Sequence, residues 1–328
     1  MAKRLLLLLA LAGCRTPPPT FVPVPKPPEM PLAPLPEPVT AVIAPQTVTP
    51  VVASAAKPVV APLLAALAAE DTPAVAALLA DDVSVTLANG DACVGAQACG
   101  QAIARALVGT KLQVLRRLQP SAEVAVVQGL VEIAQRRVPF ALVLRLADGR
   151  VAQARVYGAT APWRFTLDAP KTPLPPATSE PVDVVTAPPR FDAGPLAAAF
   201  DPATLARDAT AAGLVAEQLT YHDTTSQRET TTAQANQAAI RAFAQAFAVE
   251  SSALIGQHAA GDWLVLEREV VLQQRAPVVP VPPSAEALHV RTLEFLLVQN
   301  RTITEVWGYC DPVAFAPAVE QPAIPALH

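Results

Sequence analysis

Apolar residues recur with a helical period in several stretches of the chain, and the same order of stretches occurs twice. Positions three and four residues apart are apolar from Leu63 to Leu79, from Ala96 to Leu107 and from Ala233 to Phe247. This spacing predicts helices that each bury one face. Asp71 and Asp201 stand where a helix-capping side chain is expected, and a proline that a first turn tolerates follows each within two residues.

Stretches rich in β-branched residues follow the helices and predict strands. In the first copy they are residues 83–87, 112–118, 123–134, 138–146 and 151–157, and in the second copy 219–221, 252–257, 263–273, 290–298 and 303–309. Asp148-Gly149 and Gln299-Asn300 predict tight turns before the last strand of each copy. Asp148 matches Asn300, and Tyr157 matches Tyr309, at one constant spacing. We interpret this register as an internal duplication, with a proline-rich insertion near Pro277 lengthening one hairpin.

Clusters among the 36 prolines divide the chain further. We predict a signal peptide, a proline-rich disordered tether, a first domain, a proline-rich linker, a second domain and a flexible tail, over residues 1–13, 14–60, 61–168, 169–190, 191–314 and 315–328. Proline cannot donate a backbone hydrogen bond, so the tether favours an extended polyproline conformation. Its interpretation as a plain spacer has one alternative, a P-x-x-P ligand for a protein partner.

Helices followed by a meander of long antiparallel strands make an α+β plan. The segments Ala74–Asp82, Gly95 and Pro139–Leu144 in the first copy, and Leu219–Asp223 and Glu305–Asp311 in the second, resemble the family of NTF2-like, or SnoaL-like, domains. The resemblance implies two tandem cones, each a curved antiparallel sheet wrapped around three helices. It also implies dimerisation through the open sheet face, here as a pseudo-dimer of the two copies within one chain. The family holds polyketide cyclases, ketosteroid isomerases and non-catalytic members, so the fold does not settle the function.

The start of the chain carries a targeting signal. Lys3 and Arg4 precede the apolar run Leu5–Ala12, which is shorter than the roughly 20 residues that span a bilayer. Leu11-Ala12-Gly13-Cys14 resembles the lipobox of bacterial lipoproteins. That resemblance implies a lipid on Cys14 as the membrane anchor and a place in the bacterial cell envelope; Arg15, where an aspartate would retain the protein at the inner membrane, implies the outer membrane. The alternative is an ordinary cleaved signal with a chance cysteine.

Cys93 and Cys99 are close in sequence, and an oxidising envelope compartment would permit a local disulfide between them. The alternative is two unpaired buried thiols, because spacing does not reveal connectivity. A C-x5-C spacing does not match a zinc site, and the histidines are isolated, so we expect no metal and no cofactor. Cys310 is expected to be a small core residue. The net charge of −4 with no basic block after the signal argues against a nucleic-acid partner.

Candidate chemistry is confined to the second copy. His222 and Asp223 could form a proton-transfer pair, although neighbours on a strand point to opposite faces. Glu267 and Glu269 share a strand face, and Glu294 lies on the next strand. Three carboxylates near one cone would make a general base or a cation site. The alternative is a solvated outer face on which neighbouring arginines pair with these acids.

Trp307 and Tyr309 alternate on the last strand and, with Glu294, are the candidate lining of a ligand pocket; the alternative is a core role. We therefore expect a membrane-anchored binding or protein-interaction module, whose partner is an apolar small molecule or a protein. A second hypothesis is a lipid-anchored SnoaL-like enzyme with isomerase or cyclase-type acid–base chemistry in the second cone. A third is a structural envelope protein whose cones are filled by their own side chains.

Overall fold

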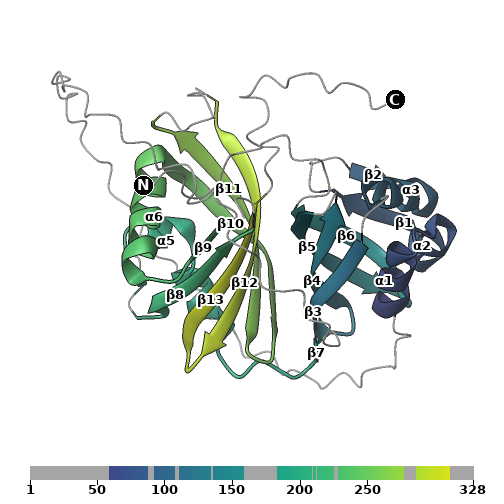
Figure 1. Cartoon of the computed structure of the whole chain (residues 1–328), viewed down its shortest axis with the longest axis horizontal. Helices are drawn as coiled ribbons and strands as arrows, with labels where there is room; N and C mark the ends of the chain where they lie inside the picture. Colours follow the sequence, from purple (N-terminus) through teal and green to yellow (C-terminus); the bar gives the residue numbers. More distant parts are fainter. Residues whose placement is uncertain are drawn as a thin grey trace, which may run out of the picture. The chain divides into compact units, whose positions relative to one another are not determined.

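The structure is a computed structural model that describes residues 59–87, 92–107, 111–133, 136–158, 183–208, 210–211, 213–224, 228–276 and 286–310. Helices and strands form two α+β halves, each with its own mixed sheet, as Figure 1 shows. The predicted fold class is confirmed. The predicted signal sequence with Cys14, residues 14–58 of the predicted tether and the predicted tail lie outside the described residues, whereas Val60, the last residue of the predicted tether, begins a helix. No helix in the described part is long and apolar enough to cross a membrane.

The described part of the first half contains three helices and a seven-stranded sheet. Its elements are α1 (Val60–Ala68), α2 (Thr72–Leu78), β1 (Leu79–Thr86), β2 (Ala92–Val94), α3 (Ala96–Leu107), β3 (Lys111–Ser121), β4 (Val124–Ile133), β5 (Arg136–Ala147), β6 (Arg150–Gly158) and β7 (Asp183–Val185). The strand order is β2-β1-β6-β5-β4-β3-β7, in which β1–β6 and β3–β7 are parallel pairs.

The second half repeats this plan. Its elements are α4 (Ala193–Ala199), α5 (Pro202–Leu205), β8 (Val215–Asp223), β9 (Arg228–Thr230), α6 (Ala233–Ala246), β10 (Phe247–Ala260), β11 (Trp263–Gln274), β12 (Leu288–Gln299) and β13 (Thr302–Cys310). The order is β10-β11-β12-β13-β8-β9. It matches the first sheet without β7 when that sheet is read from its other edge, as β3-β4-β5-β6-β1-β2. The duplication inferred from sequence is therefore present in the topology, including one parallel pair, β13–β8.

The helix caps act as expected, and the turn before the last strand of the second half lies one residue further along than the predicted Gln299-Asn300. The side chain of Asp71 accepts from the N–H of Ala74 at the start of α2, and Asp201 caps α5 in the same way. Asp148 and Gly149 both have positive φ, 50° and 73°, in the β5–β6 turn. Asn300 and Arg301 have φ of 51° and 65° in the β12–β13 turn. Two successive left-handed residues give the tight turn that matches the strand twist.

The central strands of each sheet bury both faces, since helices cover one face and the other face contacts the other half. In the first half, α1 and α3 pack on the cone face with Leu79, Val127, Leu142 and Val156. In the second half, α4 and α6 supply Leu196 and Phe243 against the apolar residues of β11 and β12. A fourth core joins the outer faces of the two sheets; it contains Leu118, Val126, Val143 and Tyr157 from the first half and Val265, Leu293, Phe295, Trp307 and Tyr309 from the second.

The predicted linker, residues 169–190, is corrected at its end. Asp183–Val185 forms β7, which pairs in parallel with Arg116–Leu118 of β3. Two valines in succession favour a strand, and the edge of β3 offers unpaired backbone groups for it. β10 is longer than the predicted strand at residues 252–257. It runs from Phe247 to Ala260, and its register with β11 shifts at two places.

Candidate functional site

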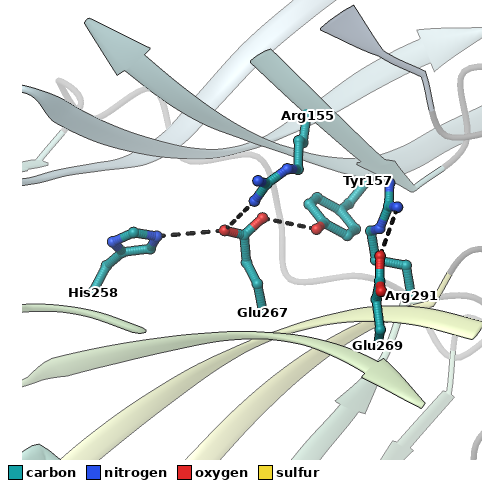
Figure 2. Close-up of polar contacts among 6 residues, drawn as sticks. All are labelled: Arg155, Tyr157, His258, Glu267, Glu269 and Arg291. Atoms are coloured by element: carbon teal, nitrogen blue, oxygen red, sulfur yellow. Dashed lines mark hydrogen bonds and ion pairs between the residues drawn. The ribbon is translucent and has the colours of Figure 1, made fainter. Parts of the chain in front are cut away.

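A buried carboxylate, Glu267 of β11, lies at the contact between the two halves. Its Oε2 accepts from Arg155 Nη1 at 2.9 Å, and its Oε1 accepts from the Tyr157 hydroxyl at 2.8 Å. His258 Nε2 lies 3.5 Å from Oε2. Figure 2 shows Arg155 and Tyr157 reaching this carboxylate from β6 of the other sheet. Glu267 is only 1% exposed, so its partners replace water completely.

The charge of Glu267 is maintained by those partners. Burial acts to raise the pKa of Glu267, but the hydrogen bonds from His258 and Tyr157 and the Arg155 charge together lower it below its ordinary value. Burial raises the pKa of Tyr157, and the neighbouring Glu267 charge raises it further, so the phenol stays a donor. A side chain at Gly256 would collide with the Glu267 carboxylate, which explains a glycine inside this strand. Both carboxylate oxygens of Glu267 accept hydrogen bonds, so this charged side chain has a structural role.

The contact repeats with pseudo-two-fold symmetry. Register pairs Gln128 with Ala141 and Glu267 with Leu293, so Gln128 and Glu267 are equivalent in the two halves, as are Tyr157 and Tyr309. Gln128 Nε2 contacts the Tyr309 hydroxyl at 3.1 Å, as Tyr157 contacts Glu267. Residue pairs that repeat with the halves exchanged are typical of a two-fold interface.

Several sequence-predicted site residues belong to this contact and do not line a cone. Tyr309 is buried in the core shared by the two halves, and Trp307 stacks on His222 with ring centroids 3.9 Å apart. Trp307 and Tyr309 therefore do not form the predicted pocket lining. Glu269 pairs with Arg291 at 2.9 Å and is 54% exposed at its side chain, which fits the solvated alternative.

His222 and Asp223 point to opposite faces, so they form no proton-transfer pair. His222 lies between two carboxylates, with Nδ1 3.1 Å from Glu229 and Nε2 3.1 Å from Glu305. The hydrogen bond with His222 is the largest influence that lowers the pKa of Glu305. Asp223 is buried on the cone face, where it contributes to raising the pKa of Tyr221.

The expectation that Glu267, Glu269 and Glu294 gather near one cone is also wrong. Glu294 pairs with Leu266, and Glu267 pairs with Leu293. Paired residues share a face, and successive residues alternate, so Glu294 lies on the cone face while Glu267 and Glu269 lie on the outer face. Only Glu294 of the three faces the second cone.

Around Glu294 the second cone holds a group of buried polar side chains. Arg268 and Thr292 are direct cross-strand partners on the cone face. Thr292 lies two residues from Glu294 on the same strand. Arg268 Nη1 donates to Asp201 Oδ2 at 3.1 Å, and Nη2 donates to the carbonyl of Ala197. Among the described residues, Arg268 Nε, Thr292 Oγ1 and Glu294 Oε2 are buried without a hydrogen-bond partner. A bound molecule or an ordered water is one way in which such atoms find a partner.

Burial raises the pKa of Glu294 to about 7, and the Arg268 charge and the Thr292 hydroxyl beside it offset that effect only in part. Burial therefore favours the protonated form of Glu294 well above the pH at which an exposed glutamate ionises. Burial, with Asp223 and Glu294 nearby, raises the pKa of Tyr221 well above its ordinary value. The Tyr221 hydroxyl lies over Gly308, which is the cross-strand partner of Glu294. A side chain at Gly308 would collide with this hydroxyl.

The equivalent positions of the first cone are apolar. The shared register places Leu142 where the second half has Glu294, Phe140 where it has Thr292, and Val156 where it has Gly308. Gly129 stands in place of Arg268, and the Phe140 ring covers it. The remaining cavity of the first cone is about 30 Å³, lined only by apolar side chains. The polar group is thus specific to the second half.

Arg268, Thr292 and Tyr221 were missed as site residues. Their signal is a polar residue that interrupts an apolar face, as Arg268 does between Leu266 and Val270 and as Thr292 and Glu294 do between Val290 and Leu296. Cys93 and Cys99 are joined by a disulfide, and Cys310 is buried in the core beside Phe243 and Val290. In the part of the chain that the structure describes, no cluster of three or more His, Cys, Asp or Glu residues could hold a metal ion.

Comparison with known proteins gives similarity to solved structures alone: no family model and no curated protein matches. An NTF2-like protein of unknown function from Cytophaga hutchinsonii is 14% identical over 31% of this chain and 87% of its own, with a TM-score of 0.28. One from Mesorhizobium loti is 22% identical over 31% and 88%, also at 0.28. A putative polyketide cyclase from Sinorhizobium meliloti is 20% identical over 30% and 92%, at 0.27. None of these proteins assigns an activity to this chain.

We predict that Glu267→Gln lowers the free energy of unfolding by about 3 kcal/mol, because it leaves the Arg155 charge, on a side chain only 18% exposed, without its partner. The matched control Glu269→Gln should cost about 1 kcal/mol or less, since that pair is half exposed. Urea unfolding at pH 7 measures both. The stabilisation by Glu267 is complete above its ordinary pKa of 4.5 and declines as pH falls towards its lowered folded-state pKa. Equal losses for the two variants would contradict the structural role of Glu267.

We predict that Glu294→Gln removes a pH dependence of stability. The folded-state pKa of about 7 exceeds the ordinary 4.5, so folding favours the protonated acid, and wild-type stability declines as pH rises through this window. The wild type should lose about 3 kcal/mol relative to Glu294→Gln between pH 4 and pH 8. Unfolding curves at several pH values measure this, with the exposed carboxylate variant Glu217→Gln as control. A constant difference across that range would refute the assignment.

Proposed function

We propose that this protein is a small-molecule binding module whose site is the second cone, with the first half as its structural partner. One observation carries the proposal: Arg268 Nε and Glu294 Oε2 are buried without hydrogen-bond partners on one face of the second sheet, beside the Thr292 hydroxyl. The corresponding part of the first cone is sealed by Phe140, Leu142 and its neighbours.

The energetics favour a bound molecule over an empty site. Each unpartnered buried polar atom costs about 1–3 kcal/mol, which a ligand or ordered water can recover. Binding sites for small molecules combine apolar walls with a few placed polar groups. Arg268 Nε can only donate, while the Thr292 hydroxyl and a carboxyl that titrates near neutrality can donate or accept. The chemistry fits a compact, mostly apolar molecule that carries a carbonyl or hydroxyl group.

We propose further that the two halves act as a pseudo-dimer, so that the chain is a monomer in solution. The shared apolar core, the Glu267 network and the repeated Gln128–Tyr309 contact support this pairing. The outer sheet face that would otherwise pair with a second chain is already occupied. Presentation at the bacterial cell envelope by a lipid on Cys14 is proposed from the Leu11–Cys14 pattern of the sequence alone.

A second candidate function is acid–base catalysis in the same cone. A general acid or base works best when its pKa lies near the working pH, and the pKa of Glu294 is about 7. Glu294 would then move a proton at the ligand, with the Tyr221 hydroxyl as a neighbouring donor. This candidate requires turnover, whereas the binding function requires only retention of the ligand.

Native mass spectrometry of the full chain purified from cells tests the proposal. We expect a monomer that carries a bound small molecule, and we expect Glu294→Leu to lose that molecule while becoming more stable at pH 7, because leucine matches its equivalent, Leu142. Glu269→Gln, on the outer face, should retain it. A wild-type protein with no bound mass, together with a crystal structure that shows the second cone filled by its own side chains, would rule out a binding site there. An obligate dimer would refute the internal pairing.

A further inference from the structure

A separate cleft of about 560 Å³ opens at the start of the second half. Its apolar surface comes from Pro189, Phe191, Pro195, Leu196 and Leu214. Leu196 belongs to the core under α4, and Phe191 packs against that core, so the floor of the cleft is held in place. The volume lies within the range of small-molecule sites, roughly 300–1,000 Å³.

Three charged residues complete the lining: Arg190, Asp192 and Arg301. Both arginines are exposed, and within the described residues neither guanidinium has a hydrogen-bond or ion-pair partner. Asp192 is engaged, since its Oδ1 accepts from the N–H of Gly194 at 3.1 Å as the cap of α4. The cleft therefore offers two unused cationic forks beside an apolar surface and has a net positive charge.

Arg301 occupies a costly backbone position. Its φ of 65° lies in the left-handed region, which disfavours a residue with a β-carbon. The equivalent turn of the first half has Gly149 there, with φ of 73°. Glycine would relieve the conformation in the second half as well. An arginine retained at such a position is a reason to look for a function of its side chain.

We propose that this cleft binds an aliphatic carboxylate, with the carboxylate on Arg190 and Arg301 and the chain along Phe191, Pro195 and Leu214. Guanidinium groups bind carboxylates through paired, charge-assisted hydrogen bonds. The apolar surface gains by covering a hydrocarbon chain, which a free inorganic anion does not have. This site is independent of the second cone, because no residue that lines it is part of the group around Glu294.

Titration of the full chain with decanoate, below its micelle concentration, tests the proposal by calorimetry and by thermal unfolding. We expect saturable binding and a rise in Tm. Decanol, with the chain but no charge, and acetate, with the charge but no chain, should each bind at least about tenfold more weakly. Equal binding of either control would overturn the proposal.

Two variants place the site. Arg301→Gly should raise the Tm of the unliganded protein, since it relieves the turn, and yet weaken decanoate binding by about tenfold or more. Arg190→Gln should weaken it similarly, whereas Arg275→Gln, an exposed arginine outside the cleft, should leave it unchanged. Decanoate binding that survives both cleft substitutions would refute the assignment. Glu294→Leu should not alter decanoate binding; a loss there would place decanoate in the second cone and also overturn the proposal.

Discussion

The buried Glu267 carboxylate makes each half dependent on the other. Its charge originates on β11, but the guanidinium and phenol that stabilise it come from β6 of the first half. An ion at 1% exposure is tolerated only while those partners stay in place. Separating the halves would expose the apolar residues of the shared core, such as Leu293 and Phe295, to water together with this ion pair. That constraint commits both outer faces to the contact, and it leaves the cone faces and the surface of the helices for binding.

Fusion of two copies in one chain removes the symmetry that a homodimer would impose. In a homodimer every substitution occurs on both sides of the axis, so a polar cone would appear twice. Here the contact has kept equivalent pairs, such as Tyr157 and Tyr309, while the cones have diverged. Phe140 and Leu142 give the first cone an apolar lining, and Thr292 and Glu294 place polar groups at the equivalent positions of the second. The first half can then stabilise the chain, while the second half can carry buried polar side chains that lower the stability of the chain.

The fold was largely predictable because its signals are local. Hydrophobic period, the caps at Asp71 and Asp201 and the turn before the last strand of each copy each depend on a few neighbouring residues. The site was not predictable in the same way, because it depends on register between strands. Alternation shows that Glu267 and Glu269 share a face, but the face of Glu294 follows from its pairing with Leu266. Trp307 and Tyr309 misled because both faces of the sheet are buried, so an aromatic side chain does not identify the cone.

The short strand β7 has a consequence for the behaviour of the protein at high concentration. A sheet edge with unpaired backbone groups is a template on which another chain can add a strand, and this is a common start of aggregation. Asp183–Val185 occupies that edge of β3, and the two bulges of β10 distort an edge of the second sheet. The segment that connects the halves therefore also acts as a guard strand. A truncated first half that lacks it would expose the edge of β3 to self-association, although every residue of its core would be present.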